Sequence, residues 1–273
     1  MEAAVSDLQG KVAIVTGGGS GLGREICLEY AARGAAVVVT SNEPTQIDAV
    51  ASQAVDAGGQ AIAWVADVTQ DEAVAALMEA TTTQFGPPDV LVNAAAIGQA
   101  AIAPDRESRA FEAVEWVQWE RLLDVNVGGT VRAMLAVLPD MKRRRAGSII
   151  NFTSGTVRFP LAGISAYTTS KYAIEGLTKV TAIELEPYGI RVNCLQPGGP
   201  ADTALVPDDV RADMRSDLHQ PSVIRSCAAW LAGDDSMLMT GRSFVAMEWN
   251  KERAIIDCPC TRCAAVANTL PFN

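Results

Sequence analysis

The sequence predicts an α/β protein, a single domain built on a doubly wound parallel sheet of about seven strands with helices on both faces. Short runs rich in Val, Ile and Ala alternate with longer segments of helical pattern along the whole chain. Strands that are apolar on both sides and separated by helix-length segments are typical of a parallel sheet covered on both faces. A glycine-rich turn at residues 17–23 directly follows the first of these runs, as it does in sheets that bind dinucleotides.

The predicted strands, in chain order, are residues 12–16, 36–40, 61–65, 90–93, 148–152, 190–195 and 243–247. A helical pattern over residues 22–32 stops at Gly34, and Glu43-Pro44 opens the next helix, because glycine ends and proline begins helices. No low-complexity linker or repeat interrupts the series. We therefore expect one dinucleotide-binding and catalytic domain over residues 1–249, in which residues 199–225 form a substrate lid, followed by a C-terminal tail over 250–273.

Composition excludes several classes of partner. The chain has 22 Lys and Arg against 32 Asp and Glu, a net charge of −10, which disfavours binding to nucleic acid or to an anionic membrane surface. No apolar run approaches the ~18 residues that span a bilayer. The first ten residues carry Glu2 and Asp7 and do not have the basic, apolar pattern of a leader. We expect a soluble, cytoplasmic protein.

The glycine turn predicts a phosphate-binding site. Residues 16–23 read Thr-Gly-Gly-Gly-Ser-Gly-Leu-Gly and precede an amphipathic helix. Glycines let the backbone turn tightly and let a pyrophosphate approach the free N–H groups at the positive end of that helix. A flexible connection is the alternative interpretation, and the position between the first strand and first helix favours the dinucleotide site.

The residue that ends the second strand of such a sheet usually selects the dinucleotide, because a carboxylate there binds the ribose 2′-OH and repels a 2′-phosphate. Ser41 and Asn42 hold this place, so NADP is tolerated without being required. Glu43 would favour NAD and Arg24 would assist a phosphate. Between NADP and NAD we favour NADP.

A serine, a tyrosine and a lysine form the candidate catalytic group. Ser154 follows the fifth predicted strand, and Tyr167 and Lys171 lie four residues apart in a helical segment, so they share one helix face. A neighbouring ammonium group favours the phenolate and brings the pKa of a tyrosine toward the working pH. A surface tyrosine and lysine on an exposed helix is the alternative, which the upstream serine and the glycine turn disfavour.

At this point the chain resembles the short-chain dehydrogenase/reductase family, of classical type and Rossmann-like fold, from about residue 10 to residue 247. Residues 16–23 match the family's T-G-x-x-x-G-x-G motif, and residues 93–96 match N-N-A-G except that Ala94 and Ala96 replace Asn and Gly. Pro197-Gly198 resembles the segment that passes the nicotinamide, although the spacing to Thr203 is one residue longer than usual.

The resemblance implies a catalytic tetrad of Asn126, Ser154, Tyr167 and Lys171. Ser154 would hydrogen-bond the substrate oxygen, Tyr167 would exchange its proton with it, Lys171 would hold the ribose and keep Tyr167 acidic, and Asn126 would anchor a water in a proton relay. The cofactor-binding residues that the sequence and the resemblance together imply are Gly17, Gly19, Ser20, Gly21, Leu22, Gly23, Ser41, Asn42, Asp67, Val68, Asn93, Ala94, Ala95, Tyr167, Lys171, Pro197, Gly198 and Thr203.

The function that follows is NAD(P)-dependent hydride transfer between a nicotinamide and a small, largely uncharged secondary alcohol or ketone. A 3-oxoacyl carrier-protein reductase and a catalytically silent dinucleotide-sensing protein are the alternatives. The first would need a basic docking face, and the second has no chemical need for a complete tetrad. We expect a homo-oligomer, a dimer or a tetramer, as is common in the family.

Several remaining signals favour structural roles. Acidic residues of the lid, including Asp209, argue against a highly anionic substrate, and the only histidine, His219, is expected to be a polar loop residue. Trp116, Trp119 and Trp230 are expected in the core or at a subunit interface. The cysteines at 258, 260 and 263 lack a fourth ligand for a closed zinc site, so no metal is expected.

Overall fold

The computed structural model describes residues 7–213 and 217–249. Within this part of the chain a seven-stranded sheet forms in the order β3-β2-β1-β4-β5-β6-β7, and every pair is parallel. The strands are β1 (Val12–Thr16), β2 (Ala36–Ser41), β3 (Gln60–Val65), β4 (Val90–Asn93), β5 (Gly147–Phe152), β6 (Ile190–Gln196) and β7 (Ser243–Val245). The predicted fold class is confirmed.

The strand order reverses between β1 and its neighbour β4, because the chain winds outward from β1 in one direction and then returns to continue in the other. In open sheets of this type a ligand crevice lies at this reversal, outside the carboxyl ends of the strands. The glycine turn after β1 and the end of β4 are therefore placed side by side by the topology.

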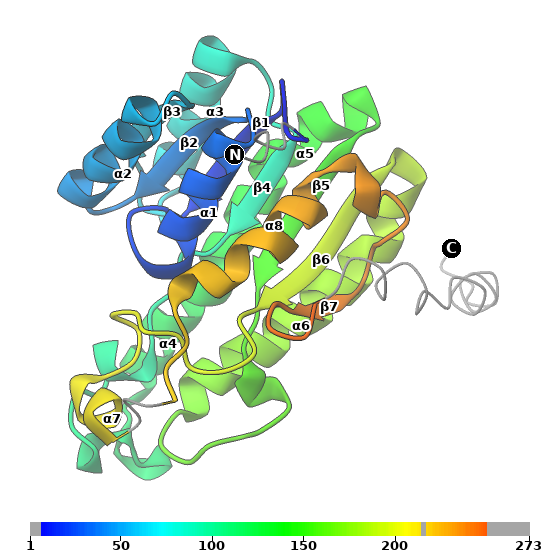
Figure 1. Cartoon of the computed structure of the whole chain (residues 1–273). Helices are drawn as coiled ribbons and strands as arrows, with labels where there is room; N and C mark the ends of the chain where they lie inside the picture. Colours follow the sequence, from blue (N-terminus) through cyan, green and yellow to red (C-terminus); the bar gives the residue numbers. More distant parts are fainter. Residues whose placement is uncertain (1–6, 214–216, 250–273) are drawn as a thin grey trace, which may run out of the picture.

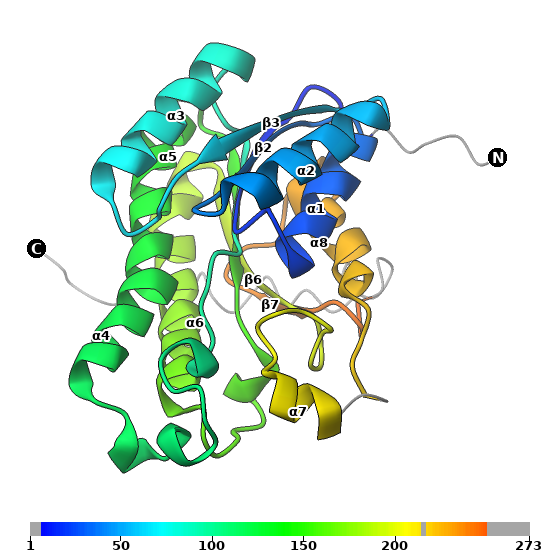
Figure 2. The ribbon, with the colours of Figure 1, turned by 90° about the vertical axis from the view of Figure 1, so that its left-hand side faces the viewer.

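Helices cover both faces of the sheet (Figures 1 and 2). The first face carries α1 (Gly21–Ala32), α2 (Pro44–Asp56) and α8 (Arg225–Ala232). The second face carries α3 (Asp71–Phe85), α4 (Trp116–Leu123), α5 (Gly129–Arg144) and α6 (Ser165–Leu185), and the short α7 (Asp208–Asp213) lies beyond the sheet edge.

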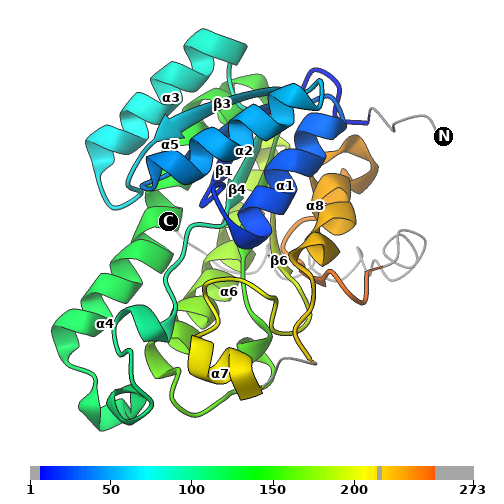
Figure 3. The ribbon, with the colours of Figure 1, turned by 60° about the vertical axis from the view of Figure 1, so that its left-hand side comes forward.

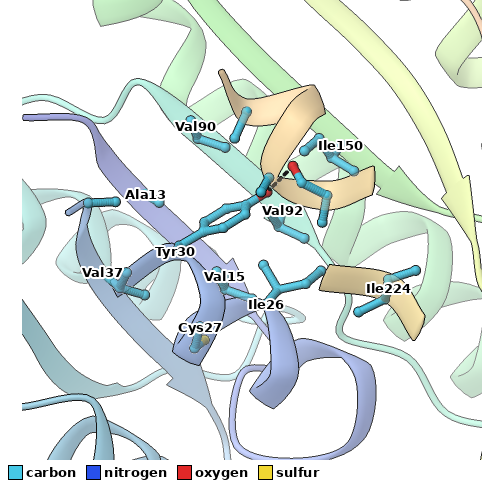
Figure 4. Close-up of a cluster of buried hydrophobic side chains, with 14 of the residues drawn as sticks. Ala13, Val15, Ile26, Cys27, Tyr30, Val37, Val90, Val92, Ile150 and Ile224 are labelled. Atoms are coloured by element: carbon cyan, nitrogen blue, oxygen red, sulfur yellow. Dashed lines mark hydrogen bonds between the residues drawn. The ribbon is translucent and has the colours of Figure 1, made fainter. Parts of the chain in front are cut away.

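Successive side chains of each strand point to opposite faces of the sheet, so the core is divided between these two faces. Val15 and Val92 point into the cluster under α1, α2 and α8, whereas Ile14 and Leu91 point into the cluster under α3, α5 and α6. Tyr30 is fully buried in the first cluster, and its hydroxyl donates to the carbonyl of Ala228 at 2.8 Å (Figure 4). The core thus locks α1, which carries the glycine turn, to α8.

One strand departs from the prediction that all seven are apolar on both sides and buried. On β3, Trp64 is 36% exposed and Val65 is 54% exposed. The strand order explains the difference, because β3 is one of the two edge strands of the described sheet and pairs only with β2 among the described residues.

By length and composition the described helical stretch Trp116–Arg144 could cross a membrane. Core helices of soluble proteins meet the same criterion. Met134, Val137 and Met141 of this stretch are buried in the core against the sheet, which accounts for part of its apolar composition.

Candidate active site

Glycines form the turn between β1 and α1 because neighbouring atoms leave no room for side chains. A Cβ added at Gly17, whose φ is +66°, would lie 2.7 Å from the backbone nitrogen of Ala95. At Gly23 it would lie 2.2 Å from the carbonyl oxygen of Gly17, and at Gly21 it would lie 2.9 Å from Cγ2 of Thr203. The turn is therefore packed against the end of β4 and against the 199–225 segment.

The N-terminus of α1 fits an anion. Ser20 is the N-cap residue but makes no side-chain capping bond, and the first backbone bond of the helix runs from Arg24 N to Ser20 O at 3.0 Å. The N–H groups of Gly21, Leu22 and Gly23 precede that bond, and groups in this position favour negative charge. The turn and the uncapped helix together suit the pyrophosphate of a dinucleotide.

The end of β2 offers neutral groups. The Ser41 hydroxyl accepts a hydrogen bond from the Glu43 backbone N–H at 3.1 Å, and Asn42 is exposed beside it. Arg24, which the sequence suggested as a partner for a phosphate, donates instead to the adjacent glutamate at 2.6 Å and to Gln53 on α2 at 2.8 Å. Its guanidinium group is thus held by protein partners.

Three further predicted cofactor residues are Asp67, Val68 and Gly19. Asp67 is exposed after β3, and one of its oxygens accepts bonds from the N–H and the hydroxyl of Thr69 at 2.9 and 2.8 Å. Val68 is buried against Gly129 of α5, where an added Cβ would lie 2.5 Å from its side chain. At Gly19 an added Cβ would lie 2.9 Å from a side chain of α2.

The end of β4 is tied to both neighbouring strands. Asn93 is buried, and its amide donates to Asn151 of β5 at 2.9 Å. The Thr16 hydroxyl of β1 accepts from the Ala95 N–H at 3.2 Å, and Ala94 lies beside the glycine turn. The Asn93 side chain therefore links β4 to β5.

Asn126 lies in a π-helical turn, Asp124–Gly128, between α4 and α5. Its side-chain oxygen accepts from the Ile97 N–H at 2.8 Å, and its amide donates to the Ile97 carbonyl at 3.0 Å and to the Ser170 hydroxyl at 3.1 Å. Both amide hydrogens are used within the protein. Asn126 thus holds the chain after β4 against α6, where Tyr167 and Lys171 lie.

Ser154 and Tyr167 meet at the carboxyl edge of the sheet. Ser154 caps the short helical turn after β5 and accepts from the Thr156 N–H at 3.3 Å. Tyr167 is the third residue of α6, and its side chain hydrogen-bonds Ser154. The two hydroxyl groups that the sequence predicted as partners are brought together.

Lys171 lies one helical turn beyond Tyr167 and is buried. Its Nζ is 5.6 Å from the centroid of the Tyr167 ring and donates to the Phe152 carbonyl at 2.9 Å. Burial lowers the pKa of Lys171 to about 8.

The prediction that the lysine brings the tyrosine pKa toward working pH is wrong for this structure. Desolvation raises the pKa of Tyr167, and the hydrogen bond from Ser154 acts in the opposite direction without reversing the shift. The physical reason is that the Lys171 ammonium group lies over the ring and bonds to a carbonyl, while desolvation has the largest effect on the pKa of the phenol.

The described part of the 199–225 segment, residues 199–213 and 217–225, begins beside the site. Gly198 has a φ of +111°, and Pro197 accepts from the Met247 N–H at 3.1 Å. Thr203 packs against Gly21 of the glycine turn, and a Cβ added at Gly98 would lie 3.1 Å from the Leu205 carbonyl. This segment therefore contacts both the glycine turn and the connection after β4 (Figure 3).

Arginine side chains hold α7 to the connection between β4 and α4. Asp209 of α7 accepts from Arg106 at 2.9 Å and from Arg109 at 3.0 Å, and the buried Arg109 also donates to the Ala103 carbonyl at 3.1 Å. The guanidinium group of Arg109, followed by that of Arg106, lowers the pKa of Asp209. A cavity of 690 Å³ lies between the two segments and is lined by these three charged residues and Arg211.

These ion pairs change the interpretation of the acidic lid. The sequence argued against a highly anionic substrate from the acidic residues alone. In the structure Asp209 is neutralised by Arg106 and Arg109, and Asp202 lies 3.4 Å from Arg211. The carboxylates of Asp209 and Asp202 are therefore weak evidence about the charge of a substrate.

Sequence reasoning missed Gln99 and Arg109, and it did not predict the ion pairs of Asp209. Gln99 is 3% exposed, and its side-chain oxygen accepts from the Tyr167 N–H at 3.2 Å. Arg109 and Asp209 are 100 residues apart in sequence. No local pattern in the sequence marks these contacts, because each partner comes from a different connection beyond the sheet.

The remaining predicted residues take varied places. His219 packs on Gly199, where an added Cβ would lie 2.6 Å from its Nε2. Trp230 is buried and Trp119 is half-buried, whereas Trp116 is 67% exposed. The cysteines at 258, 260 and 263 lie outside the described residues, and within those residues no group of His, Cys, Asp or Glu is arranged to hold a metal.

The fold and the site define a Rossmann-like α/β protein with a Ser–Tyr–Lys group beside a glycine turn. Residues 11–213 match the family model for short chain dehydrogenases. The chain is 36% identical over 247 residues to the "Short chain dehydrogenase/reductase astE" of Aspergillus oryzae, covering 86% of this chain and 92% of the relative.

Two more relatives agree. The "3-alpha-(or 20-beta)-hydroxysteroid dehydrogenase" of Mycobacterium bovis is 35% identical over 240 residues, covering 87% of this chain and 88% of the relative. A crystal structure of a short-chain type dehydrogenase/reductase from Mycobacterium marinum superposes with a TM-score of 0.79 at 30% identity, covering 88% and 95% of the two chains. The chain belongs to the short-chain dehydrogenase/reductase family and is an oxidoreductase.

Proposed function

We propose that this protein transfers a hydride between NAD(P) and a secondary alcohol or ketone, with Tyr167 as the general acid and base. The observation that carries the proposal is the hydrogen bond between Ser154 and Tyr167, with buried Lys171 next to the ring. This group lies at the same sheet edge as the glycine turn. Enzymes of the family generally use NAD(P).

The glycine turn, the N-terminus of α1 and Thr203 would hold the dinucleotide, which would supply or accept the hydride when bound. Ser154 and Tyr167 would both donate hydrogen bonds to the substrate oxygen, where negative charge develops during reduction. Tyr167 would give its proton to that oxygen, or remove it in oxidation. Lys171 would hold the ribose hydroxyls.

In the proton relay, Asn126 would bind a water through its backbone or through the remaining lone pair of its side-chain oxygen. Both of its amide hydrogens are donated to Ile97 and Ser170, so the side chain has no further hydrogen to offer a water. We therefore propose that Asn126 orients the chain after β4 and α6, with the relay water bound beside it.

Exposed apolar residues on the loop between Ser154 and Tyr167 favour an apolar substrate. Phe159 is 75% exposed and Leu161 is 64% exposed on the loop between Ser154 and Tyr167, and Leu205 covers the connection after β4. A relative is named a hydroxysteroid dehydrogenase, so hydroxysteroids belong among the secondary alcohols to be tested.

The proposal is tested by measuring turnover of a panel of secondary alcohols, ketones and hydroxysteroids. Turnover is monitored through the absorbance of the reduced nicotinamide. Each substrate is offered with NAD(H) and with NADP(H). The neutral Ser41 and Asn42 at the end of β2 tolerate NADP without requiring it, and we favour NADP; equal affinity for NAD in a titration would remove that preference. Dinucleotide binding without turnover of any substrate would favour the silent sensing protein.

A 3-oxoacyl carrier-protein reductase is the alternative enzyme. It would recognise an acidic carrier through a basic face, which a chain of net charge −10 provides poorly. Turnover of free small ketones with no gain from a carrier-bound substrate would support the present proposal.

We also propose that the protein is a homo-oligomer and cytoplasmic. Trp116, Val117 and Leu135 are 61–67% exposed on α4 and α5, and Val180 and Ile183 are 56% and 59% exposed on α6. These helices cover the same face of the sheet (Figure 2), and such exposed apolar residues favour association. Light scattering after gel filtration tests this, and a monomer at micromolar concentration would contradict it.

A further inference from the structure

The first N–H groups of α6, the helix that carries Tyr167, have no acceptors within the helix. The first three N–H groups of α6 belong to Ser165, Ala166 and Tyr167, and the first backbone bond of the helix runs from Thr168 N to Ile164 O at 2.9 Å. Ile164 provides no side-chain cap. First turns without partners fray, and Tyr167, the proposed acid and base, lies within this turn.

A side chain from a distant segment supplies the missing partner. Gln99, in the connection between β4 and α4, accepts from the Tyr167 N–H through its Oε1 at 3.2 Å. The Tyr167 carbonyl on the other side accepts from the Ser170 hydroxyl at 2.6 Å, and Ser170 in turn accepts from Asn126. Both backbone polar groups of Tyr167 are thus held by side chains.

Stability alone explains Gln99 poorly. The side chain is 3% exposed, and its Nε2 has no hydrogen-bond partner among the residues that the structure describes. Leaving a buried donor without a partner costs about 1–3 kcal/mol, whereas one neutral hydrogen bond gains only about 0.5–1.5 kcal/mol. An apolar side chain of the same length would remove the cost of the Nε2 donor but would leave the Tyr167 N–H without its acceptor. These two contributions to stability oppose each other, so stability gives no strong preference for glutamine at this position.

The segment that carries Gln99 is also the segment that α7 contacts. The Gln99 carbonyl accepts from the Ala103 N–H at 2.9 Å, and the Ala103 carbonyl accepts from Arg109, which binds Asp209 of α7. Gly98 packs against Leu205. The position of Gln99 is thus set by the connection after β4 and by the segment that follows β6.

We propose that Gln99 is a positioning residue that fixes the backbone of Tyr167, so that the phenol is aligned for proton transfer. The inference rests on the proposed function of Tyr167. It assigns to Gln99 no contact with the reacting atoms, and it requires that the effect of Gln99 on turnover be separate from its effect on folding.

The test compares Gln99→Met, which keeps the length and removes the acceptor, with Gln99→Glu, which keeps an acceptor. We expect Gln99→Met to lower kcat by about tenfold or more, since misplacement of a catalytic group by ~1 Å can cost a hundredfold. KM, dinucleotide affinity and Tm should stay close to wild type. Gln99→Glu should recover a substantial part of kcat, because a carboxylate accepts from N–H groups at a helix N-terminus.

Amide hydrogen exchange of the cofactor-free protein gives a readout that does not depend on turnover. The first turn of α6 should exchange faster in Gln99→Met than in wild type, and Gln99→Glu should restore protection. Thr81→Val is the matched control, because Thr81 is fully buried on α3 and loses one hydrogen bond, to the Leu77 carbonyl. It should change neither kcat nor exchange in α6.

The outcomes separate the two proposals. If Tyr167→Phe is inactive while Gln99→Met keeps kcat within about twofold of wild type, the role of Gln99 is refuted and the role of Tyr167 stands. A fall in kcat that follows a fall in Tm, without recovery in Gln99→Glu, assigns Gln99 to folding and also overturns the inference. If Tyr167→Phe retains full turnover, the proposed function itself fails.

Discussion

Replacing Tyr167 by Phe removes one oxygen atom at the point where proton transfer is proposed. The ring of Tyr167 packs in the cluster of Ile102, Leu122 and Ala166, so Phe should keep its place while losing the hydrogen bond with Ser154. General acid–base catalysis by a positioned side chain contributes about 10²–10⁴-fold. This factor corresponds to about 3–5 kcal/mol in the activation barrier.

Tyr30→Phe is a matched control, because it removes the same oxygen from the core. The Tyr30 hydroxyl is fully buried and donates to the Ala228 carbonyl at 2.8 Å (Figure 4). Its loss removes one buried hydrogen bond, which contributes about 0.5–1.5 kcal/mol to the free energy of unfolding. Tm should fall by about 2–4 °C for each kcal/mol, and kcat should be unchanged.

The assay follows absorbance of the reduced nicotinamide under saturating substrate, with dinucleotide affinity and Tm measured on the same preparations. The expected result is a crossed pattern in which Tyr167→Phe loses kcat and keeps Tm, whereas Tyr30→Phe loses Tm and keeps kcat. A loss of kcat below about tenfold in Tyr167→Phe would refute general acid–base catalysis by this residue. An equal loss of kcat in Tyr30→Phe would show that the assay reports folding.

Three further predictions concern the turn, the segment around α7 and the pH profile. Gly23→Ala should weaken dinucleotide binding, measured by calorimetry, and should lower stability by about 1–3 kcal/mol through overpacking. The control Gly176→Ala places its Cβ in open space on α6 and should leave binding unchanged. Equal dinucleotide affinities in the two variants would contradict this prediction. Asp209→Asn should raise KM more than it lowers kcat, because it weakens the ion pairs that hold α7 to Arg106 and Arg109. The control Asp140→Asn, which removes an ion pair with Arg143 on α5, should leave KM unchanged. An unchanged KM in Asp209→Asn would count against a role of α7 in covering the substrate. Since burial raises the pKa of Tyr167, alcohol oxidation should accelerate and ketone reduction should slow as pH rises toward that pKa, and parallel profiles in the two directions would exclude Tyr167 as the titrating group.

Strand positions followed from the sequence because each strand of a doubly wound sheet is packed by helices and reads as an apolar run. β1 (Val12–Thr16) and β4 (Val90–Asn93) have the predicted bounds, and β2, β3, β5 and β6 differ by a single residue at one end. β7 ends at Val245, two residues before the predicted end. The exposure of β3 could not be read in this way, because it depends on which strand ends the sheet.

The candidate catalytic residues were predictable because their spacing along the chain follows the order of the elements. Ser154 follows β5, and Tyr167 and Lys171 lie in α6, so the topology places them at one edge of the sheet. The contacts of Gln99 and Arg109 were not predictable. They join connections that lie outside the regular elements, where the sequence carries neither periodicity nor a fixed partner distance.

Burial acts against charge on both members of the tyrosine–lysine pair. It raises the pKa of Tyr167 and lowers the pKa of Lys171 to about 8. The side chains by themselves therefore favour a protonated phenol at neutral pH, which is the form that donates a proton to a reduced carbonyl. A substrate oxygen in this site would meet two neutral donors, Ser154 and Tyr167, whose attraction for developing negative charge is strengthened where water is excluded. The same exclusion makes the phenolate costly, so the protonated phenol is the form from which the proposed proton transfer to a carbonyl would start.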